Sequence, residues 1–484
     1  MIKLNEKKIQ KKSNKKSTSI GKKAALYSFG HVADTASYQS FTLLSFVFYF
    51  AIVKVPTLYI TIGFCIWSIW NAFNDPLLGY FSDRTHTKWG RRIPYIMVAF
   101  VPLAILSILL YTPPLPGSEA PTGQLINFIY FLIIIIVFEL FYTMFSINMV
   151  SLFPEIFLSD EERRVGNNIR QFFLIIGLLI GVILPGIIIG DFTNESSHFN
   201  YIIVGIIIAV TIILGALIFL IFGPKERKTF KEDYKNAPPF FQSLKLCIKS
   251  KSFMWYIPAE IANWFVYGLL LPIVPLYGEF VLGLEEGAVM ISLFLAATFL
   301  SAVLFITVIW KPVVRKIGNR KAWLCSMSIW IATLIPLFFL GPGMEIIALI
   351  CFFFIGLGLA GSLYIIDLII SDIVDQDEAT CGYRREAAYY GVNALFMRFS
   401  TIFVMISIGL VFTSSGWQVF KPENVTATTI LGLKFLMVIL PIIALLISII
   451  AIYKYPLHGE KLKNVKKELD KIHQEKESKI KGLT

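Results

Sequence analysis

Long apolar segments alternate with short polar connections along most of this chain. Each is about 20 residues long, the length that an α-helix needs to cross the hydrocarbon core of a bilayer. The twelve segments span residues 26–50, 58–81, 93–111, 125–147, 169–189, 201–222, 253–277, 288–309, 322–340, 346–368, 387–412 and 433–453. The pattern predicts an all-α membrane protein with twelve transmembrane helices.

A charged connection divides these segments into two groups of six, and its Pro238-Pro239 pair is typical of a linker. The connections after the second and eighth segments, GYFSDRTHTKWGRR and WKPVVRKIGNRKAW, both carry a glycine and a basic cluster. Basic inner loops are common, so this repeat is only modest support for two pseudo-symmetric six-helix halves of the major facilitator kind. The expected order is a basic tail (1–25), an N-terminal half (26–222), a linker (223–252), a C-terminal half (253–453) and a second tail (454–484).

Composition supports a membrane protein and excludes other classes. Of 484 residues, 56% are hydrophobic and 16% are charged, which is more apolar surface than one soluble core buries. The five cysteines have no paired spacing, so we expect neither disulfides nor a metal site. The net charge of +12 resides in the tails and connections rather than in a stripe with aromatic residues, so nucleic acid is not an expected partner.

The distribution of lysine and arginine predicts the orientation in the membrane. Most of these 44 residues fall in the two tails and in the connections after the even-numbered segments. The positive-inside rule then places both termini in the cytoplasm, and we expect the plasma membrane. Residues 1–25 hold nine lysines and no apolar core, which is typical of a disordered cytoplasmic tail rather than a signal peptide. The sequons at Asn194 and Asn424 fall on the opposite side.

Charged side chains inside the apolar segments are the candidate chemistry. A lone charge facing lipid costs several kcal/mol, so we expect these groups to converge on a hydrated cavity. They are Asp34, Asp75, Glu139, Arg170, Glu260, Asp367 and Arg398.

The second segment carries the strongest candidate for cation binding. Asn71 and Asp75 are four residues apart and share a helix face, and Pro76 leaves the carbonyl of Ala72 without its helical donor. Oxygen ligands of this kind bind a small cation, and Asp75 could equally carry a proton. The alternative is a proline-kinked helix in which Asp75 pairs with an arginine for packing.

The fourth segment adds a polar stripe, because Glu139, Tyr142 and Ser146 recur at helical spacing and Thr143 lies beside them. The stripe could complete a cation site or bind a polar substrate. It could also be a set of interhelical hydrogen bonds, which hydroxyl groups often make in membrane helices.

The connection after the second segment is expected to have a mechanical role. Its charges could form hydrogen bonds to helix ends and neighbouring inner loops, and so latch the cytoplasmic side of a carrier. The residues of this expected gate are Asp83, Arg84, Arg91 and Arg92. Positive-inside anchoring is the simpler interpretation of Lys88, whereas an acid such as Asp83 contributes little to orientation. Lysine and glutamate at helical spacing in the C-terminal tail predict a helix exposed to solvent or lying on the membrane surface.

Several motifs resemble the glycoside-pentoside-hexuronide:cation symporters, the melibiose-permease group. They are NDPLLGYFSDRTHTKWGRRIPYI (74–96), YTMFSINMVSLFP (142–154), IRQFF (169–173), SDIVD (371–375) and REAAYYGVNALFMR (385–398). The resemblance covers nearly all twelve segments, and the first motif is the most specific.

This resemblance implies a carrier in which acidic residues bind a coupling cation and a sugar lies between the halves. By position, Asp75 matches a family aspartate, and Tyr142 and Thr143 match a family Tyr-Thr pair. Arg170 matches a family arginine, and Arg398 stands where the family has a lysine. The expected cation-binding residues are Asp75, Asn71, Thr143, Ser146 and Glu139. The expected substrate-binding residues are Asp34, Tyr142, Arg170, Asn393 and Arg398.

Departures from the family pattern modify this expectation. Asn71 and Ser146 replace two family aspartates, which makes a tight Na⁺ site less favourable and favours proton coupling through Asp75 with Glu139. Val150 and Leu363 fall where the melibiose-permease group has tryptophans in its sugar site, which weakens the case for galactosides.

The expected function is therefore secondary active symport of a sugar or glycoside with H⁺ or Na⁺ by alternating access, without a cofactor. The alternative is a symporter of an amphiphile such as a lysophospholipid, because lysophospholipid symporters share the Phe138-Glu139 pair. An enzyme is not expected, since the sequence has no GxSxG, HExxH or Walker A pattern. The expected partners are a small-molecule substrate and the lipid bilayer, and we expect a monomer.

Overall fold

The computed structural model describes residues 2–85, 87–157, 160–225, 245, 247–284, 287–381 and 386–481. Side chains are described for these residues except 2–19, 80, 83, 154, 160, 161, 386–388 and 473–481. The chain forms two compact units. The first unit contains residues 1–235 and 286–292, and the second contains 236–285 and 293–484.

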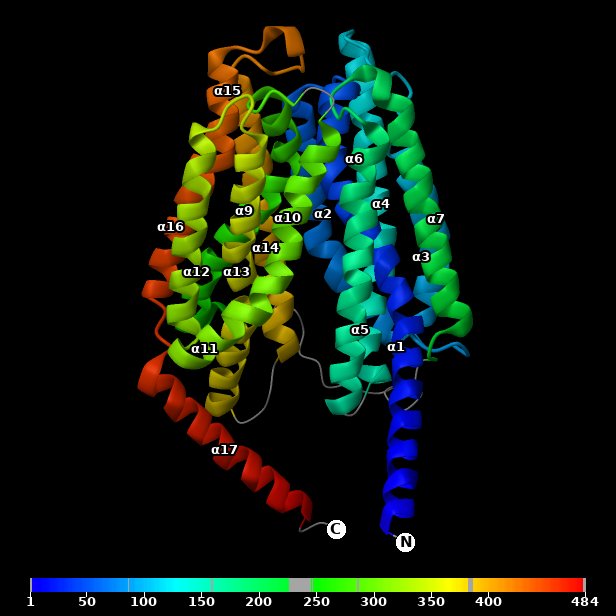
Figure 1. Cartoon of the computed structure of the whole chain (residues 1–484), viewed down its shortest axis with the longest axis vertical. Coiled ribbons are helices and arrows are strands. Elements are labelled where there is room, and N and C mark those ends of the chain that lie inside the picture. Colours follow the sequence, from blue (N-terminus) through cyan, green and yellow to red (C-terminus); the bar gives the residue numbers. More distant parts are fainter. Residues whose placement is uncertain are drawn as a thin grey trace. The chain divides into compact units, whose positions relative to one another are not determined.

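Helices account for the regular structure of both units in the described ranges (Figure 1). The first unit contains α1 (Ile2–Val47) with η1 (Phe48–Ile52), α2 (Thr57–Arg84), α3 (Ile93–Leu109), α4 (Pro121–Ile156), α5 (Asp160–Leu178) with η2 (Leu179–Ile183) and α6 (Leu184–Ile189), and η3 (Glu195–Ser197) with α7 (His198–Phe222). These make six helical runs, one for each apolar segment predicted from the sequence.

The second unit also has six runs, although residues 288–292 at the start of its α10 belong to the first unit. It contains α9 (Lys251–Phe280), α10 (Ala288–Phe305) with η6 (Ile306–Trp310) and α11 (Lys311–Ile317), α12 (Asn319–Leu334) with η7 (Ile335–Phe339), α13 (Glu345–Cys381), α14 (Glu386–Ser414), and η8 (Pro422–Asn424) before α15 (Ala427–Lys434), η9 (Phe435–Ile439) and α16 (Leu440–Tyr453). The last element, α17 (Gly459–Lys481), follows these runs. Several runs change briefly to π- or 3₁₀-helix without ending, so each run remains one continuous helical element.

Helix α1 packs between α5 and α7, and small residues permit the close approach (Figure 1). A Cβ atom added at Gly181 would lie 2.8 Å from the carbonyl oxygen of Ala36, and one added at Gly215 would lie 2.7 Å from that of Phe29. Since lipid provides no hydrophobic drive between helices, such backbone approach is a main source of packing energy in a membrane. This packing fixes the position of α1, and therefore of Asp34, within the first unit.

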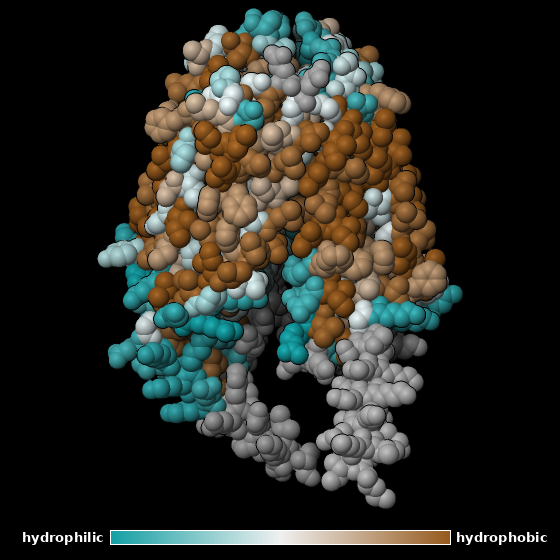
Figure 2. All heavy atoms as spheres, in the orientation of Figure 1, coloured by the Kyte–Doolittle hydropathy of each residue, from teal (hydrophilic) through white to brown (hydrophobic). Residues whose placement is uncertain are grey.

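The surfaces of the units match a bilayer. On the face shown in Figure 2, hydrophobic residues cover the middle of each unit and hydrophilic residues gather towards the ends. Within the described ranges, nine helical runs are long and apolar enough to cross a membrane, and α3 is a shorter apolar helix. The remaining two runs, α1 and α2, pack against these helices.

The N-terminal tail differs from the sequence-based expectation, whereas the C-terminal tail forms the predicted helix. The backbone of residues 2–25 continues α1 as helix, because a lysine-rich segment that extends an existing helix needs no new nucleation. Helix α17 is helical with mostly exposed side chains, as predicted from its sequence, and it also packs against α13. Lys466 pairs there with Asp372 at 2.8 Å and with Asp375 at 3.5 Å. Burial would lower the pKa of Lys466, but these two carboxylates outweigh it and raise that pKa above its ordinary value.

Lys54 ties together three connections at the end of the first unit opposite the α2–α3 loop. Its ammonium lies 2.6 Å from a carboxylate oxygen of Glu195 and 3.3 Å from one of Glu119. The hydrogen bond to Glu195, helped by Glu119, raises the pKa of Lys54 despite partial burial. The backbone of Lys54 has a φ of 63°, a left-handed conformation that is uncommon for a residue other than glycine. The ion pairs hold this turn in place.

We expect Lys54→Met to lower the free energy of unfolding by about 1 kcal/mol, because both carboxylates are mostly exposed and the ion pairs are screened. A raised lysine pKa stabilises the fold fully below the ordinary lysine pKa, and this contribution is lost as the pH rises through the raised value. Melting curves of the two proteins should therefore converge at strongly alkaline pH. Lys421→Met, which removes an exposed lysine from the second unit, serves as the control. A difference between wild type and Lys54→Met that persists at alkaline pH would contradict this assignment.

Candidate functional site

One hydroxyl group joins two carboxylates from different helices of the first unit. Thr143 on α4 places its Oγ1 3.0 Å from Oδ1 of Asp75 on α2 and 3.2 Å from Oε1 of Glu139 on α4. Glu139 and Thr143 are almost fully buried, and Asp75 is half-buried. The structure thus brings together three of the residues expected to bind a cation.

This arrangement restricts the protonation of the cluster. A threonine hydroxyl has one proton to donate, so it can donate to only one of the two carboxylates. The other contact becomes favourable if the second carboxyl group carries a proton and donates it to the hydroxyl oxygen, or if a cation lies beside both acids. The cluster is therefore chemically suited to take up and release one positive charge.

Other residues of α2 hold Glu139 in position. Trp67 donates from Nε1 to Oε2 of Glu139 at 3.1 Å, and Asn74 donates from Nδ2 to the backbone oxygen of Glu139 at 3.4 Å. Sequence analysis missed both residues. The signal was present, since Trp67, Asn71, Asn74 and Asp75 recur at spacings of three and four residues and so share one helix face.

Asn71 and Ser146 do not join this cluster by direct hydrogen bonds. The side-chain amide of Asn71 is completely buried, and neither its oxygen nor its nitrogen has a hydrogen-bond partner among the described residues. A buried amide without partners is costly, which makes Asn71 available to a bound ion, water or substrate. Ser146 instead faces Asp34 on α1.

A second polar cluster surrounds Asp34. The hydroxyls of Tyr142 and Ser146 lie beside its carboxylate, and Arg170 interacts with it electrostatically. Nδ1 of His31 lies 4.0 Å from Oδ2 of Asp34. Three expected substrate-binding residues of the first unit, Asp34, Tyr142 and Arg170, therefore belong to one neighbourhood.

Aromatic rings accompany this second cluster. The ring of Tyr142 stacks on Tyr38 with centroids 4.9 Å apart and lies parallel to Phe138 with centroids 6.1 Å apart. The guanidinium of Arg170 lies 4.6 Å from the ring centroid of Phe153 and donates to Oδ1 of Asn167 at 2.9 Å. Stacked rings next to hydroxyls and a cation form the mixed surface that polar organic ligands use.

The second unit contains a buried carboxylate of its own. Glu260 on α9 is 2% exposed and accepts hydrogen bonds from Tyr256 at 2.9 Å, Trp264 at 3.0 Å and Asn393 at 3.1 Å. Asn393, an expected substrate-binding residue on α14, thus binds a protein carboxylate with its amide nitrogen. Its amide oxygen is buried without a hydrogen-bond partner in the described part of the chain.

Arg398 and Asp367 complete the charged residues within the spans of the second unit. Arg398, expected to bind substrate, is half-buried on α14. Asp367 lies on α13, with its side chain exposed and close enough to Glu260 for electrostatic repulsion.

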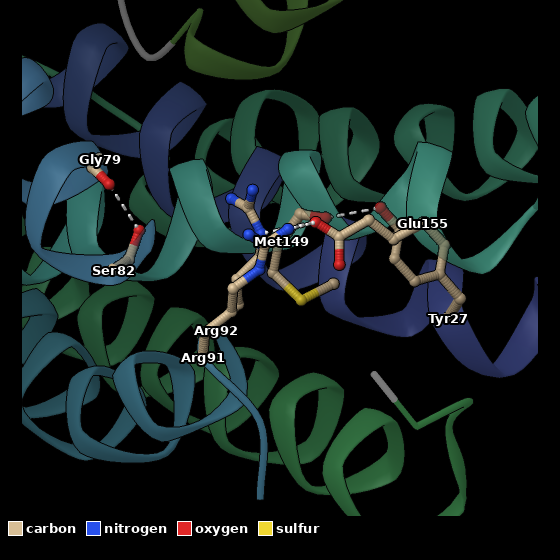
Figure 3. A network of polar contacts seen from close by, with 7 residues as sticks. All are labelled: Tyr27, Gly79, Ser82, Arg91, Arg92, Met149 and Glu155. Carbon is tan, nitrogen blue, oxygen red and sulfur yellow. Dashed lines mark hydrogen bonds and ion pairs between the residues drawn. The ribbon is translucent and has the colours of Figure 1, made fainter. Parts of the chain in front are cut away.

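The α2–α3 connection binds the end of α4 through a buried ion-pair cluster (Figure 3). Nη2 of Arg91 lies 2.6 Å and Nε of Arg92 lies 3.0 Å from the same oxygen, Oε1 of Glu155. All three side chains are largely buried, with exposures of 8%, 11% and 9%. Lys23 adds a hydrogen bond to the carbonyl of Ile156 at 2.8 Å. Cations at this position also interact favourably with the C-terminal end of the α4 dipole.

Two of the expected gate residues, Arg91 and Arg92, therefore share Glu155, which was not predicted from the sequence. Arg84 is exposed at the end of α2. The backbone of Asp83 belongs to α2, but its side chain lies outside the described residues.

Charged clusters inside apolar helices are typical of membrane transporters, and the proteins to which this chain is similar are transporters rather than enzymes. The family model described as MFS/sugar transport protein matches residues 26–459. The chain therefore belongs to this family of the major facilitator superfamily and has its fold.

Individual relatives have low identity but long coverage. The isoprimeverose transporter of Lactiplantibacillus pentosus is 25% identical over 434 residues, covering 88% of this chain and 87% of that protein. The sodium-dependent lysophosphatidylcholine symporter 1 of Mus musculus is 23% identical over 469 residues, covering 88% and 84%. Among solved structures, the nucleoside transporter NupG superposes with a TM-score of 0.62 at 14% identity, covering 90% of this chain and 100% of that one. The last comparison concerns the fold alone.

Proposed function

We propose that this chain is a secondary active transporter. It carries a sugar or glycoside together with a proton, in symport, by alternating access. The observation that supports coupling is the single Thr143 hydroxyl shared by Asp75 and Glu139. Two acids that share one hydroxyl proton favour the uptake of a further proton or a cation at this point. In this proposal Asp75 exchanges the proton, and Glu139 and Thr143 stabilise it.

A proton suits this cluster better than Na⁺. A sodium site needs several oxygen ligands around the ion, and the amide of Asn71 and the hydroxyl of Ser146 do not join the two carboxylates through hydrogen bonds. Na⁺ remains the alternative coupling ion, with the oxygen of Asn71 as an additional ligand.

A sugar is the proposed substrate class because the remaining polar groups suit hydroxyl-rich ligands. Asp34 and Arg170 in the first unit, and Asn393 and Arg398 in the second, offer charged and amide groups that hydrogen-bond vicinal hydroxyls. Tyr142 adds an aromatic face. The relative named as an isoprimeverose transporter supports a sugar, and the relative named as a lysophosphatidylcholine symporter supports the amphiphile alternative.

The proposal includes a plasma-membrane location with both termini in the cytoplasm and a monomeric carrier. The basic clusters that support this orientation include Arg91, Arg92 and the lysines of both tails.

Uptake by the purified protein in proteoliposomes tests the proposal. We expect an inward proton gradient to drive accumulation of a pentoside, hexoside or hexuronide, and an uncoupler to abolish it. A sodium gradient at constant pH should have little effect. Accumulation of lysophosphatidylcholine without any sugar uptake would reject the substrate class, and uptake that never exceeds equilibration under either gradient would reject coupling.

A further inference from the structure

A pocket of about 540 Å³ lies at the end of the first unit where α3, α7 and the α2–α3 connection meet, apart from the polar clusters described above. Helix α3 contributes Ile93 and Met97 to its wall, and α7 contributes Leu217 and Ile221. Met97, Leu217 and Ile221 are 40%, 36% and 64% exposed, which is expected where a wall faces lipid. The volume lies within the range typical of small-molecule sites.

The polar edge of this pocket is basic. Its described charged residues are Lys88, Arg91 and Lys225. Arg91 is engaged by Glu155. Lys88 and Lys225 are exposed, and neither ammonium has a carboxylate partner in the described part of the chain. Two cations are therefore available beside an apolar groove.

Trp89 marks the level of this edge relative to the membrane. Its ring is 55% exposed, and the ammonium of Lys88 lies 4.6 Å from the ring centroid. Tryptophan is enriched at the headgroup level of bilayers, where its apolar ring and polar N–H are both accommodated. The apolar walls then continue into the hydrocarbon region while the lysines stay among the headgroups.

We propose that this pocket is a binding site for an anionic phospholipid of the leaflet on this side. An acyl chain lies along Met97 and Leu217, between α3 and α7, and the phosphate lies between Lys88 and Lys225. Charge complementarity selects an anionic headgroup over a zwitterionic one. A bound lipid would stabilise the α2–α3 connection, which also contains Arg91 of the Arg91–Glu155 ion pair.

Native mass spectrometry of the full-length protein in detergent tests this site. We expect phosphatidylglycerol to bind roughly 25-fold more tightly than phosphatidylcholine with the same acyl chains, about fivefold for each lysine. The double variant Lys88→Gln/Lys225→Gln should bind both lipids equally. The matched control Lys463→Gln/Lys467→Gln removes two exposed lysines from α17 and should retain the preference.

Two further measurements separate a lipid site from a site for a small anion. Met97→Trp should fill the groove and weaken both lipids, while its melting temperature shows whether the protein is folded. A large excess of glycerol 3-phosphate should fail to displace phosphatidylglycerol, because it has no chain for the apolar walls. Displacement by glycerol 3-phosphate, or an unchanged preference in Lys88→Gln/Lys225→Gln, would overturn the proposal.

Discussion

Replacing Glu155 with glutamine is expected to lower the free energy of unfolding by about 3–5 kcal/mol, because the buried guanidiniums of Arg91 and Arg92 lose the carboxylate that they share. For a unit of this size, that loss corresponds to a fall of roughly 6–15 °C in the melting temperature. Thermal denaturation in detergent, followed by size-exclusion chromatography, measures it.

Further variants show whether the loss of stability comes from unpaired buried charges or from any substitution at Glu155. Burying a charge without a partner is far more costly than replacing a whole ion pair with apolar groups. The triple variant Glu155→Leu/Arg91→Leu/Arg92→Leu, which removes every charge of this cluster, should therefore be more stable than Glu155→Gln. Glu460→Gln, at an exposed position of α17, should melt within about 1 °C of wild type, as expected for an exposed charge. A Glu155→Gln protein as stable as wild type would show that the cluster contributes little.

This ion-pair cluster illustrates what sequence analysis could not provide. Arg91 and Arg92 were recognisable as part of a basic connection, but Glu155 lies near the end of a span, where a carboxylate is expected to be solvated. Its burial depends on the α2–α3 connection folding back onto α4. That contact joins residues more than 60 positions apart, and no local pattern encodes it.

The helices themselves were readily predicted because a bilayer imposes a strong constraint. Every span must satisfy its backbone hydrogen bonds internally, so length and hydropathy are nearly sufficient to locate it. The helix ends were less predictable. Helix α4 continues nine residues beyond the predicted boundary at 147, because helical hydrogen bonding does not stop where the apolar pattern stops.

The sequence predicted on which helix face each residue of the candidate site lies, but not which residues it contacts. Helical spacing correctly placed Asn71 and Asp75 on one face of α2, and Glu139, Tyr142 and Ser146 along α4. It could not indicate that Thr143 would contact Asp75, or that Ser146 would turn towards Asp34. Those contacts depend on the rotation of α2 and α1 relative to α4, which packing of the whole unit determines.

Replacing Asp75 with asparagine is expected to abolish proton-driven accumulation. Asparagine keeps the size and the hydrogen-bonding capacity towards Thr143, but it cannot take up a proton. With one proton carried per substrate, an imposed gradient of one pH unit supplies about 1.4 kcal/mol and concentrates the substrate at most about tenfold, whereas the variant should reach a ratio of about 1. Uptake into proteoliposomes with an imposed pH gradient measures both ratios.

Substrate exchange distinguishes lost coupling from lost binding. Counterflow in the absence of a gradient requires substrate binding and alternating access without net proton movement, so we expect Asp75→Asn to retain it within about threefold. Asp470→Asn, which removes an exposed carboxylate from α17, should leave both activities unchanged. Thr143→Val keeps both carboxylates but removes the hydroxyl that they share, and should reduce accumulation without abolishing counterflow. If Asp75→Asn accumulated substrate as well as wild type, the proton would have to be carried elsewhere, and Glu260 with its three donors would be the next group to examine.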